Sequence, residues 1–214
     1  FISGPTQHHW NFVKKIAQKT EHKIWVCDYP KAPENTITKI SQNIDSIYTV
    51  ALEKFKPNQI SFVGDSVGGT LITSLIQRLV VKELLLPKKI ILLSPVMDAS
   101  LTNPEIEKLD HTDPMLSKKG VLSAKKMCAE QNDLLDEKIS PLFGSFNKFP
   151  HTILFLAGND ITYPDQKLFV QKLIDAHINF ELFDGKNMPH IWPILPIMKE
   201  AKIALNEIIK ILNV

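Results

Sequence analysis

The sequence predicts an α/β fold in which an open, mostly parallel β-sheet carries helices on both faces. Short β-rich runs alternate along the chain with longer segments of helical pattern. Most of these runs are rich in Ile, Val, Leu or Phe with little polar alternation, which is typical of strands covered on both faces. Ligands of such sheets bind beyond the carboxyl ends of the strands, so we expect functional residues just after each strand.

The first half of the chain alternates regularly between helix and strand. In order, we predict a helix at 8–19, a strand at 22–27, a helix at 36–55, a strand at 59–63, a helix at 67–81 and a strand at 89–93. The helix at 36–55 places Ile37, Ile40 and Ile44 on one face. The helix at 67–81 follows its strand at once, and single crossovers of this kind join parallel strands.

The second half continues the pattern after an interruption. Strands are predicted at 152–157 and 179–183, and helices at 163–176 and 194–212. Residues 96–148 break the rhythm with Asn-Pro, Asp-Pro and Gly120, followed by a helical stretch at 122–131. We therefore expect one α/β domain over residues 1–214 with a lid-like insertion at about 96–148. A plain surface elaboration is the alternative for that segment.

Composition excludes several classes of function. Of the residues, 44% are hydrophobic and 22% charged, and 25 basic residues against 23 acidic ones give a net charge of +2. That balance, with Arg78 as the sole arginine, argues against nucleic acid as a partner. No apolar run is long enough for a membrane span.

Cysteine usage and the first residues bear on compartment. Cys27 and Cys128 form neither a disulfide framework nor a CxxC zinc pattern, so we expect no metal or other cofactor and a reducing, cytoplasmic setting. The chain begins Phe-Ile-Ser-Gly without an initiator Met, and a signal peptide therefore cannot be judged.

The strongest motif is a G-x-S-x-G turn between a strand and a helix. Residues 64–69 read Gly64-Asp65-Ser66-Val67-Gly68-Gly69 and hold three of the chain's eight glycines. A sharp turn there pushes the Ser66 hydroxyl into the cleft, and side chains two positions from the serine would collide with strand or helix. The Val67 amide then lies at a helix N-terminus, where it can stabilise an oxyanion. A glycine-rich turn that only packs a helix on a sheet is the alternative.

A serine nucleophile needs a base, and the base needs an acid to hold its tautomer. Asp160 follows the strand at 152–157, and His190 follows the strand at 179–183, in the chain order Ser, acid, His that this motif requires. Asp165, at a helix entrance, and Asp184, at a strand end, are competing acids. Four other histidines suit surface or packing roles: His22, His111, His151 and His177.

These motifs resemble the hormone-sensitive-lipase-like esterases of the α/β-hydrolase superfamily, in particular their bacterial lipase/esterase branch. The similarity extends along essentially the whole chain. It lies in residues 28–34 (DYPKAPE), 64–69 (GDSVGG), 94–98 (SPVMD), 113–116 (DPML), 158–161 (GNDI) and 188–190 (MPH). The resemblance implies an esterase of small carboxylic esters with Ser66, Asp160 and His190 as its catalytic triad.

The resemblance also bears on the start of the chain. The family carries a His-Gly-Gly-Gly loop, whose amides supply most of the oxyanion hole, just before a stretch resembling residues 1–4 and His9. We therefore expect further oxyanion donors upstream of Phe1, with Val67 as the donor present. We also expect the 214-residue piece to be poorly active and to dimerise or aggregate through unpaired strand edges.

Two other functions remain open at this point. Amidases, formamidases and peptidases use the same triad, because the leaving group is recognised by the pocket and not by the triad. A non-catalytic α/β-hydrolase that binds a small ligand is the other alternative, since fold alone does not fix function.

Overall fold

A four-stranded parallel sheet forms the centre of the protein. The computed structural model describes residues 1–214, apart from the side chain of Asn132. The strands are β1 (Ser61–Asp65), β2 (Lys89–Leu93), β3 (His151–Ala157) and β4 (Phe180–Gly185), hydrogen-bonded in the order β1-β2-β3-β4. Every neighbouring pair is parallel. Each strand therefore needs a crossover to reach the next, and their carboxyl ends share one edge.

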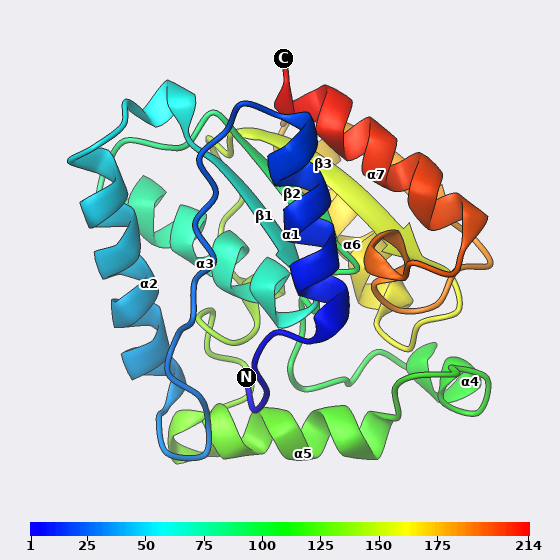
Figure 1. Ribbon diagram of the computed structural model, residues 1–214. Coiled ribbons are helices and arrows are strands. Elements are labelled where there is room, and N and C mark those ends of the chain that lie inside the picture. Colours follow the sequence, from blue (N-terminus) through cyan, green and yellow to red (C-terminus); the bar gives the residue numbers. More distant parts are fainter.

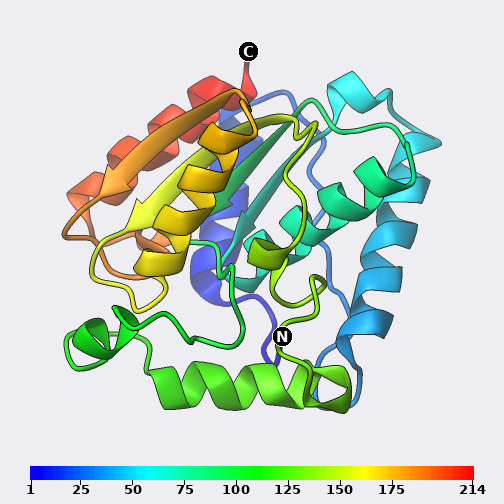
Figure 2. The ribbon, with the colours of Figure 1, turned by 180° about the vertical axis from the view of Figure 1, so that it is seen from behind.

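Helices cover both faces of this sheet, so the predicted fold class is confirmed. The main helices are α1 (Gln7–Lys19), α2 (Ile37–Leu52), α3 (Val67–Val81), α6 (Tyr163–Asp175) and α7 (Lys199–Leu212). Helices α1 and α7 lie on one face, in front of the sheet in Figure 1. Helices α2, α3 and α6 lie on the opposite face, which Figure 2 presents to the viewer.

Alternate residues of each strand enter two separate cores. On β2, Ile91 and Leu93 pack with the α1–α7 layer, whereas Ile90 and Leu92 pack with the α2–α3–α6 layer. All five residues of β2 are buried. The absence of polar alternation in the sequence thus reflects a strand whose two faces are both inside the protein.

The inserted segment, residues 96–148, contains α4 (Ile106–Asp110), α5 (Lys118–Cys128), and the 3₁₀ turns η2 (Glu130–Asn132) and η3 (Pro141–Phe143). Helices α4 and α5 lie beyond the carboxyl ends of the strands (Figures 1 and 2), and the rest of the segment returns along the α3–α6 face, where Leu142 and Phe146 join the core. Two further 3₁₀ turns are η1 (Pro57–Gln59) and η4 (Trp192–Ile194). Helix α5 begins four residues before the predicted stretch at 122–131 because the Ser117 hydroxyl caps it, accepting the Gly120 N–H at 3.2 Å.

Strand β1 lies two residues later than predicted, and α2 ends three residues earlier. Two further predictions were wrong, one in type and one in where the element begins. Residues 22–27 are not a strand: they run extended past the β1 side of the molecule, with Trp25 and Val26 exposed, and form no ladder with the described sheet. Apolar, β-branched composition alone cannot make a strand without a neighbour to pair with. The final helix starts at Lys199 and not at residue 194, because η4 and Pro196 occupy the intervening stretch. Among the described residues, no helix has the length and apolar character needed to cross a membrane.

Candidate active site

Ser66 occupies a strained turn between β1 and α3. Its backbone has φ 50° and ψ −117°, a positive φ that a non-glycine residue adopts only when its surroundings enforce it. The Ser66 N–H donates to Leu93 O at 2.9 Å, and the Val96 N–H donates to Ser66 O at 3.2 Å. Both ends of the serine peptide are thereby tied to the chain that leaves β2. The Val67 N–H begins α3, directly beside the serine.

The elbow glycines differ in how much space they have. A Cβ on Gly64 would lie 2.7 Å from Gly68 C, and a Cβ on Gly69 would lie 2.6 Å from Pro95 Cβ. A Cβ on Gly68 would meet nothing within 4 Å. The expected collision two positions from the serine therefore holds at Gly64 and is wrong at Gly68. The close packing on the helix side falls one residue later, at Gly69.

The structure brings Ser66, His190 and Asp160 into one hydrogen-bonded chain. His190 Nε2 lies 2.8 Å from Ser66 Oγ, and His190 Nδ1 lies 2.6 Å from Asp160 Oδ2. Asp160 is fully buried and His190 is 3% exposed. A carboxylate accepts hydrogen bonds, so Nδ1 carries the proton and Nε2 of the neutral ring is free to accept the Ser66 O–H. This is the tautomer that a general base needs.

Asp160 is held by more than the imidazole. Its Oδ1 accepts the Thr162 N–H and the Thr162 hydroxyl, each at 2.8 Å, and its Oδ2 accepts Gln166 Nε2 at 3.0 Å. These donors satisfy the charge of a carboxylate that has no access to solvent. They also fix the direction in which its second oxygen faces His190.

The electrostatic surroundings of His190 favour its protonated form. Burial lowers the pKa of His190, but the Asp160 carboxylate and its hydrogen bond outweigh burial, with smaller contributions from Asp65 and Asp113. The pKa therefore lies above the ordinary value of the ring. A raised pKa makes the ring a stronger base toward the serine proton.

The competing residues lie apart from this chain of contacts. Asp165 Oδ1 accepts Asn103 Nδ2 at 2.9 Å, and Asp184 accepts the Tyr163 hydroxyl at 3.1 Å. His22 contacts Leu212 O, and His151 pairs with Glu181. Neither competing acid is hydrogen-bonded to His190.

Sequence reasoning missed two supports of the site. His9 Nε2 lies 3.1 Å from Asp65 Oδ2, so α1 is joined to the residue that precedes the nucleophile. The Ser94 hydroxyl accepts the Ile191 N–H at 3.0 Å, directly after His190. These contacts join residues 56 and 97 positions apart in the chain. No local pattern could have indicated either pairing, although Ser94 and Asp65 lie in motifs that the sequence analysis noted.

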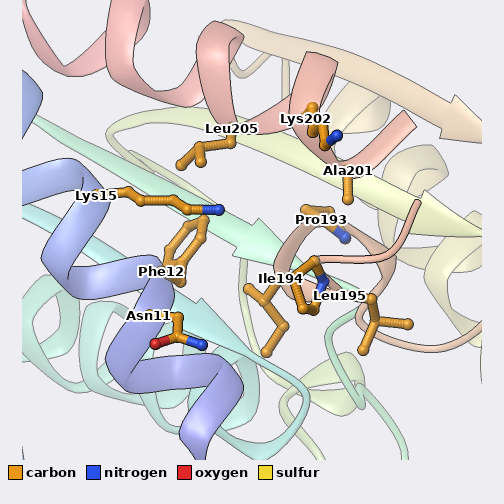
Figure 3. A pocket seen from close by; sticks show the side chains of 10 residues that line it. Asn11, Phe12, Lys15, Pro193, Ile194, Leu195, Ala201, Lys202 and Leu205 are labelled. Carbon is orange, nitrogen blue, oxygen red and sulfur yellow. The ribbon is translucent and has the colours of Figure 1, made fainter. Parts of the chain in front are cut away.

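One small cavity has none of the three catalytic candidates in its lining. It lies between α1, η4 and α7, and its lining includes Phe12, Lys15, Pro193 and Leu205 (Figure 3). Its volume of about 20 Å³ is room for one water molecule and not for a substrate. Within the part of the chain that the structure describes, no group of three or more His, Cys, Asp or Glu side chains is arranged to hold a metal ion.

Comparisons with known proteins agree with the fold. Residues 1–194 match the family model of the alpha/beta hydrolase fold. An esterase of Acinetobacter venetianus is 29% identical over 97% of this chain and 70% of that relative. The chain spans 57% and 52% of the length of two other curated relatives.

Solved structures give the same result. A candidate esterase from Staphylococcus aureus has a TM-score of 0.93 and 33% identity, covering 97% of this chain and 70% of that one. An esterase of the bacterial hormone-sensitive lipase family has a TM-score of 0.89 and 24% identity, over 98% of this chain and 71% of that one. The resemblance predicted from the motifs is thus confirmed. The chain belongs to the α/β-hydrolase fold family, among relatives named as esterases and lipases.

Proposed function

We propose that the protein hydrolyses small carboxylic esters through an acyl-enzyme formed on Ser66. The observation that carries the proposal is the unbroken contact from Ser66 Oγ through His190 to the buried carboxylate of Asp160, at 2.8 and 2.6 Å. Relatives along nearly the whole chain are esterases, which supports the ester as the bond that is cleaved.

In the first half of the reaction, His190 Nε2 takes the Ser66 proton as Oγ attacks the ester carbonyl carbon. The carbonyl π pair moves onto oxygen, and the Val67 N–H at the positive end of α3 is one donor to that oxyanion. The tetrahedral intermediate collapses, the C–O bond to the alcohol breaks, and the alcohol leaves with the proton from His190. Asp160 stabilises the imidazolium without taking its proton.

In the second half, water replaces the alcohol. His190 takes a proton from water, the hydroxide oxygen attacks the acyl carbon, and Ser66 leaves with the proton that His190 returns. The products are a carboxylic acid and the free enzyme. Each step uses groups of this chain and one water molecule.

We also propose that the inserted segment borders the substrate site. Its helices α4 and α5 lie beyond the strand ends at which Ser66 and His190 are found (Figure 1). The Ile161 side chain, next to Asp160, is buried against Leu101 and Ile106 of this segment. A wall joined to the acid in this way suits a cleft that must exclude water.

A fluorophosphonate probe tests the proposal directly. The protein, produced with any residues that precede Phe1 in its gene, should be labelled, and Ser66→Ala should not. Ser46→Ala is the matched control, because Ser46 is an exposed serine on α2 whose one described hydrogen bond is to Gln42 O. Labelling that persists in Ser66→Ala contradicts the assignment of the nucleophile. Faster turnover of p-nitroanilides than of p-nitrophenyl acetate or butyrate would instead identify an amidase.

A further inference from the structure

We propose that Asp113, in the D-P-M-L turn of the inserted segment, is a positioning residue that fixes the catalytic acid and directs negative charge toward the catalytic base. The proposal rests on the proposed function, since it assigns Asp113 a part in the same site. Asp113 has no described hydrogen bond to Ser66 or His190. It acts through the residues that do the chemistry.

The two carboxylate oxygens of Asp113 serve two different segments. Oδ1 accepts the Met115 N–H at 2.7 Å and the Leu116 N–H at 2.9 Å, which closes the turn on its own segment. Oδ2 accepts the Ile161 N–H at 2.8 Å, from a residue 48 positions away. One side chain therefore joins the inserted segment to the acid turn, residues 158–162, at the peptide immediately after Asp160.

The position of the Ile161 peptide determines where the Asp160 carboxylate lies. It stands between Asp160 and Thr162, and Thr162 gives Asp160 Oδ1 two of its hydrogen bonds. The Ile161 side chain is fully buried in a cluster that the inserted segment supplies. A shift of this peptide would move the carboxylate and its Thr162 donors together, and the 2.6 Å contact between Asp160 and His190 would not survive it.

Charge provides a second, independent indication. The carboxylates that act on His190 come from three elements: Asp160 in the acid turn, Asp65 at the end of β1, and Asp113 in the inserted segment. Asp160 has the largest effect of the three, and all of them raise the pKa of the ring against the opposing effect of burial. Asp65 has its own partner in His9, at 3.1 Å. Asp113 has no cationic side chain among its described hydrogen-bond partners, which are backbone amides.

A plain turn residue would look different. Asp133, in the same inserted segment, accepts the Leu135 N–H at 2.9 Å in a turn of similar kind. Its carboxylate has no described hydrogen bond to the acid turn, and it is not among the groups that shift the pKa of His190. Asp133→Asn is therefore the matched control for Asp113→Asn.

The first experiment compares these two variants in ester hydrolysis across pH. In Asp113→Asn, an NH₂ group replaces one carboxylate oxygen, so a donor stands where an acceptor is needed. Either the hydrogen bonds to Met115 and Leu116 or the hydrogen bond to Ile161 is then lost. We expect kcat/KM to fall by roughly 10- to 100-fold, the range typical when a supporting contact orients a reacting group. The acid limb of the kcat/KM profile should move to lower pH, because a negative charge near His190 has been removed. Asp133→Asn should change neither kcat/KM nor the pH at which its acid limb falls.

The second experiment does not depend on activity. The titration of His190, followed by NMR of histidine-labelled protein, should have a lower midpoint in Asp113→Asn than in the wild type. The comparison of His190 midpoints remains informative even if the wild type fails to react with a fluorophosphonate probe. Such a failure would refute the proposed function and leave the Asp113 inference to be judged by the NMR midpoint.

Asp113→Ser provides the remaining safeguard, because its short hydroxyl can close the local turn but cannot reach Ile161. It should reproduce the losses of Asp113→Asn while the circular dichroism spectrum stays that of the wild type. Unchanged kcat/KM with an unchanged His190 midpoint in either folded variant would overturn the inference. Loss of folding in both variants would overturn it as well, by showing that Asp113 serves the fold and not the site.

Discussion

Gly158→Ala should inactivate the enzyme by separating the acid from the base. Gly158 directly follows β3, two residues before Asp160, and its N–H donates to Gly185 O at 2.8 Å. A Cβ at this position would lie 1.8 Å from Lys186 O, whereas ordinary contact begins at 3.4 Å. Lys186 O is a backbone atom and the position of a Cβ is fixed by its own backbone, so rotation of a side chain cannot relieve the clash.

The size of the effect follows from that distance. The acid turn and the loop from Lys186 to His190 must move apart by roughly 1.5 Å before a Cβ fits. A hydrogen bond of 2.6 Å between Asp160 and His190 is lost over such a displacement. Misplacement of a reacting group by about 1 Å costs on the order of 100-fold, so we expect kcat/KM to fall at least about 100-fold. Overpacking of this kind also destabilises by about 1–3 kcal/mol.

Hydrolysis of p-nitrophenyl acetate and thermal unfolding measure the two effects. At this chain length each kcal/mol lowers Tm by about 2–4 °C, so a folded but inactive variant is expected at moderate temperature. Gly4→Ala is the control, since a Cβ there meets nothing within 4 Å, and both of its values should match the wild type. Wild-type kcat/KM in Gly158→Ala would refute the claim that close approach of these two loops aligns the triad.

Asp160→Asn should lower kcat by about 10⁴ with little change in KM, because the wrong His190 tautomer then faces the serine. In the wild type, kcat/KM should fall as pH falls through the raised pKa of His190, since a protonated ring cannot accept the serine proton. Burial raises the pKa of Asp165 to about 6, above the value of about 3.9 in an unfolded chain, so ionising it costs stability as pH rises. Asp165→Asn should therefore stabilise the protein by about 1–3 kcal/mol at pH 8 and remove this pH dependence between about pH 4 and 6, as chemical denaturation would show. The hydrogen bond to Asp65 raises the pKa of His9, so the ion pair stabilises fully below about pH 6.5 and less as pH rises through the raised value. The Tm difference between His9→Gln and wild type should accordingly be larger at pH 6 than at pH 9.

The sequence predicted those parts of the fold in which local pattern and tertiary environment agree. Helix α3 was predicted at 67–81 and spans Val67–Val81, because its start is fixed by the elbow and its interior is apolar. Strands β2 and β3 were predicted within one residue, since a run of buried aliphatic residues is unambiguous in a parallel sheet. Residues 22–27 have similar composition but pair with no strand of the described sheet, and composition carries no information on partners.

The positions of the candidate site residues could be predicted because each follows a strand. Chain order and the shared edge of a parallel sheet indicated that Ser66, Asp160 and His190 would meet, and their hydrogen-bond distances agree with that expectation. The catalytic roles themselves stay a prediction. The supports of these groups could not be foreseen, since the link from Asp113 to Ile161 depends on how the inserted segment folds back on the sheet.

The edge position of β4 affects how the protein responds to heat. In the described sheet β4 pairs only with β3, so the amides and carbonyls on its other side are hydrogen-bonded to no strand of that sheet. The loop that follows β4 carries His190. Strands secured on one side open at lower free energy than those secured on two. β1 is the other edge of the described sheet, but Ser66 after it is tied on both sides, by its N–H to Leu93 O and by its carbonyl to the Val96 N–H. The nucleophile and the acid after β3 would therefore stay in place during an opening of β4 while the imidazole departs. Catalysis should therefore fail reversibly at temperatures at which the two hydrophobic cores are still intact.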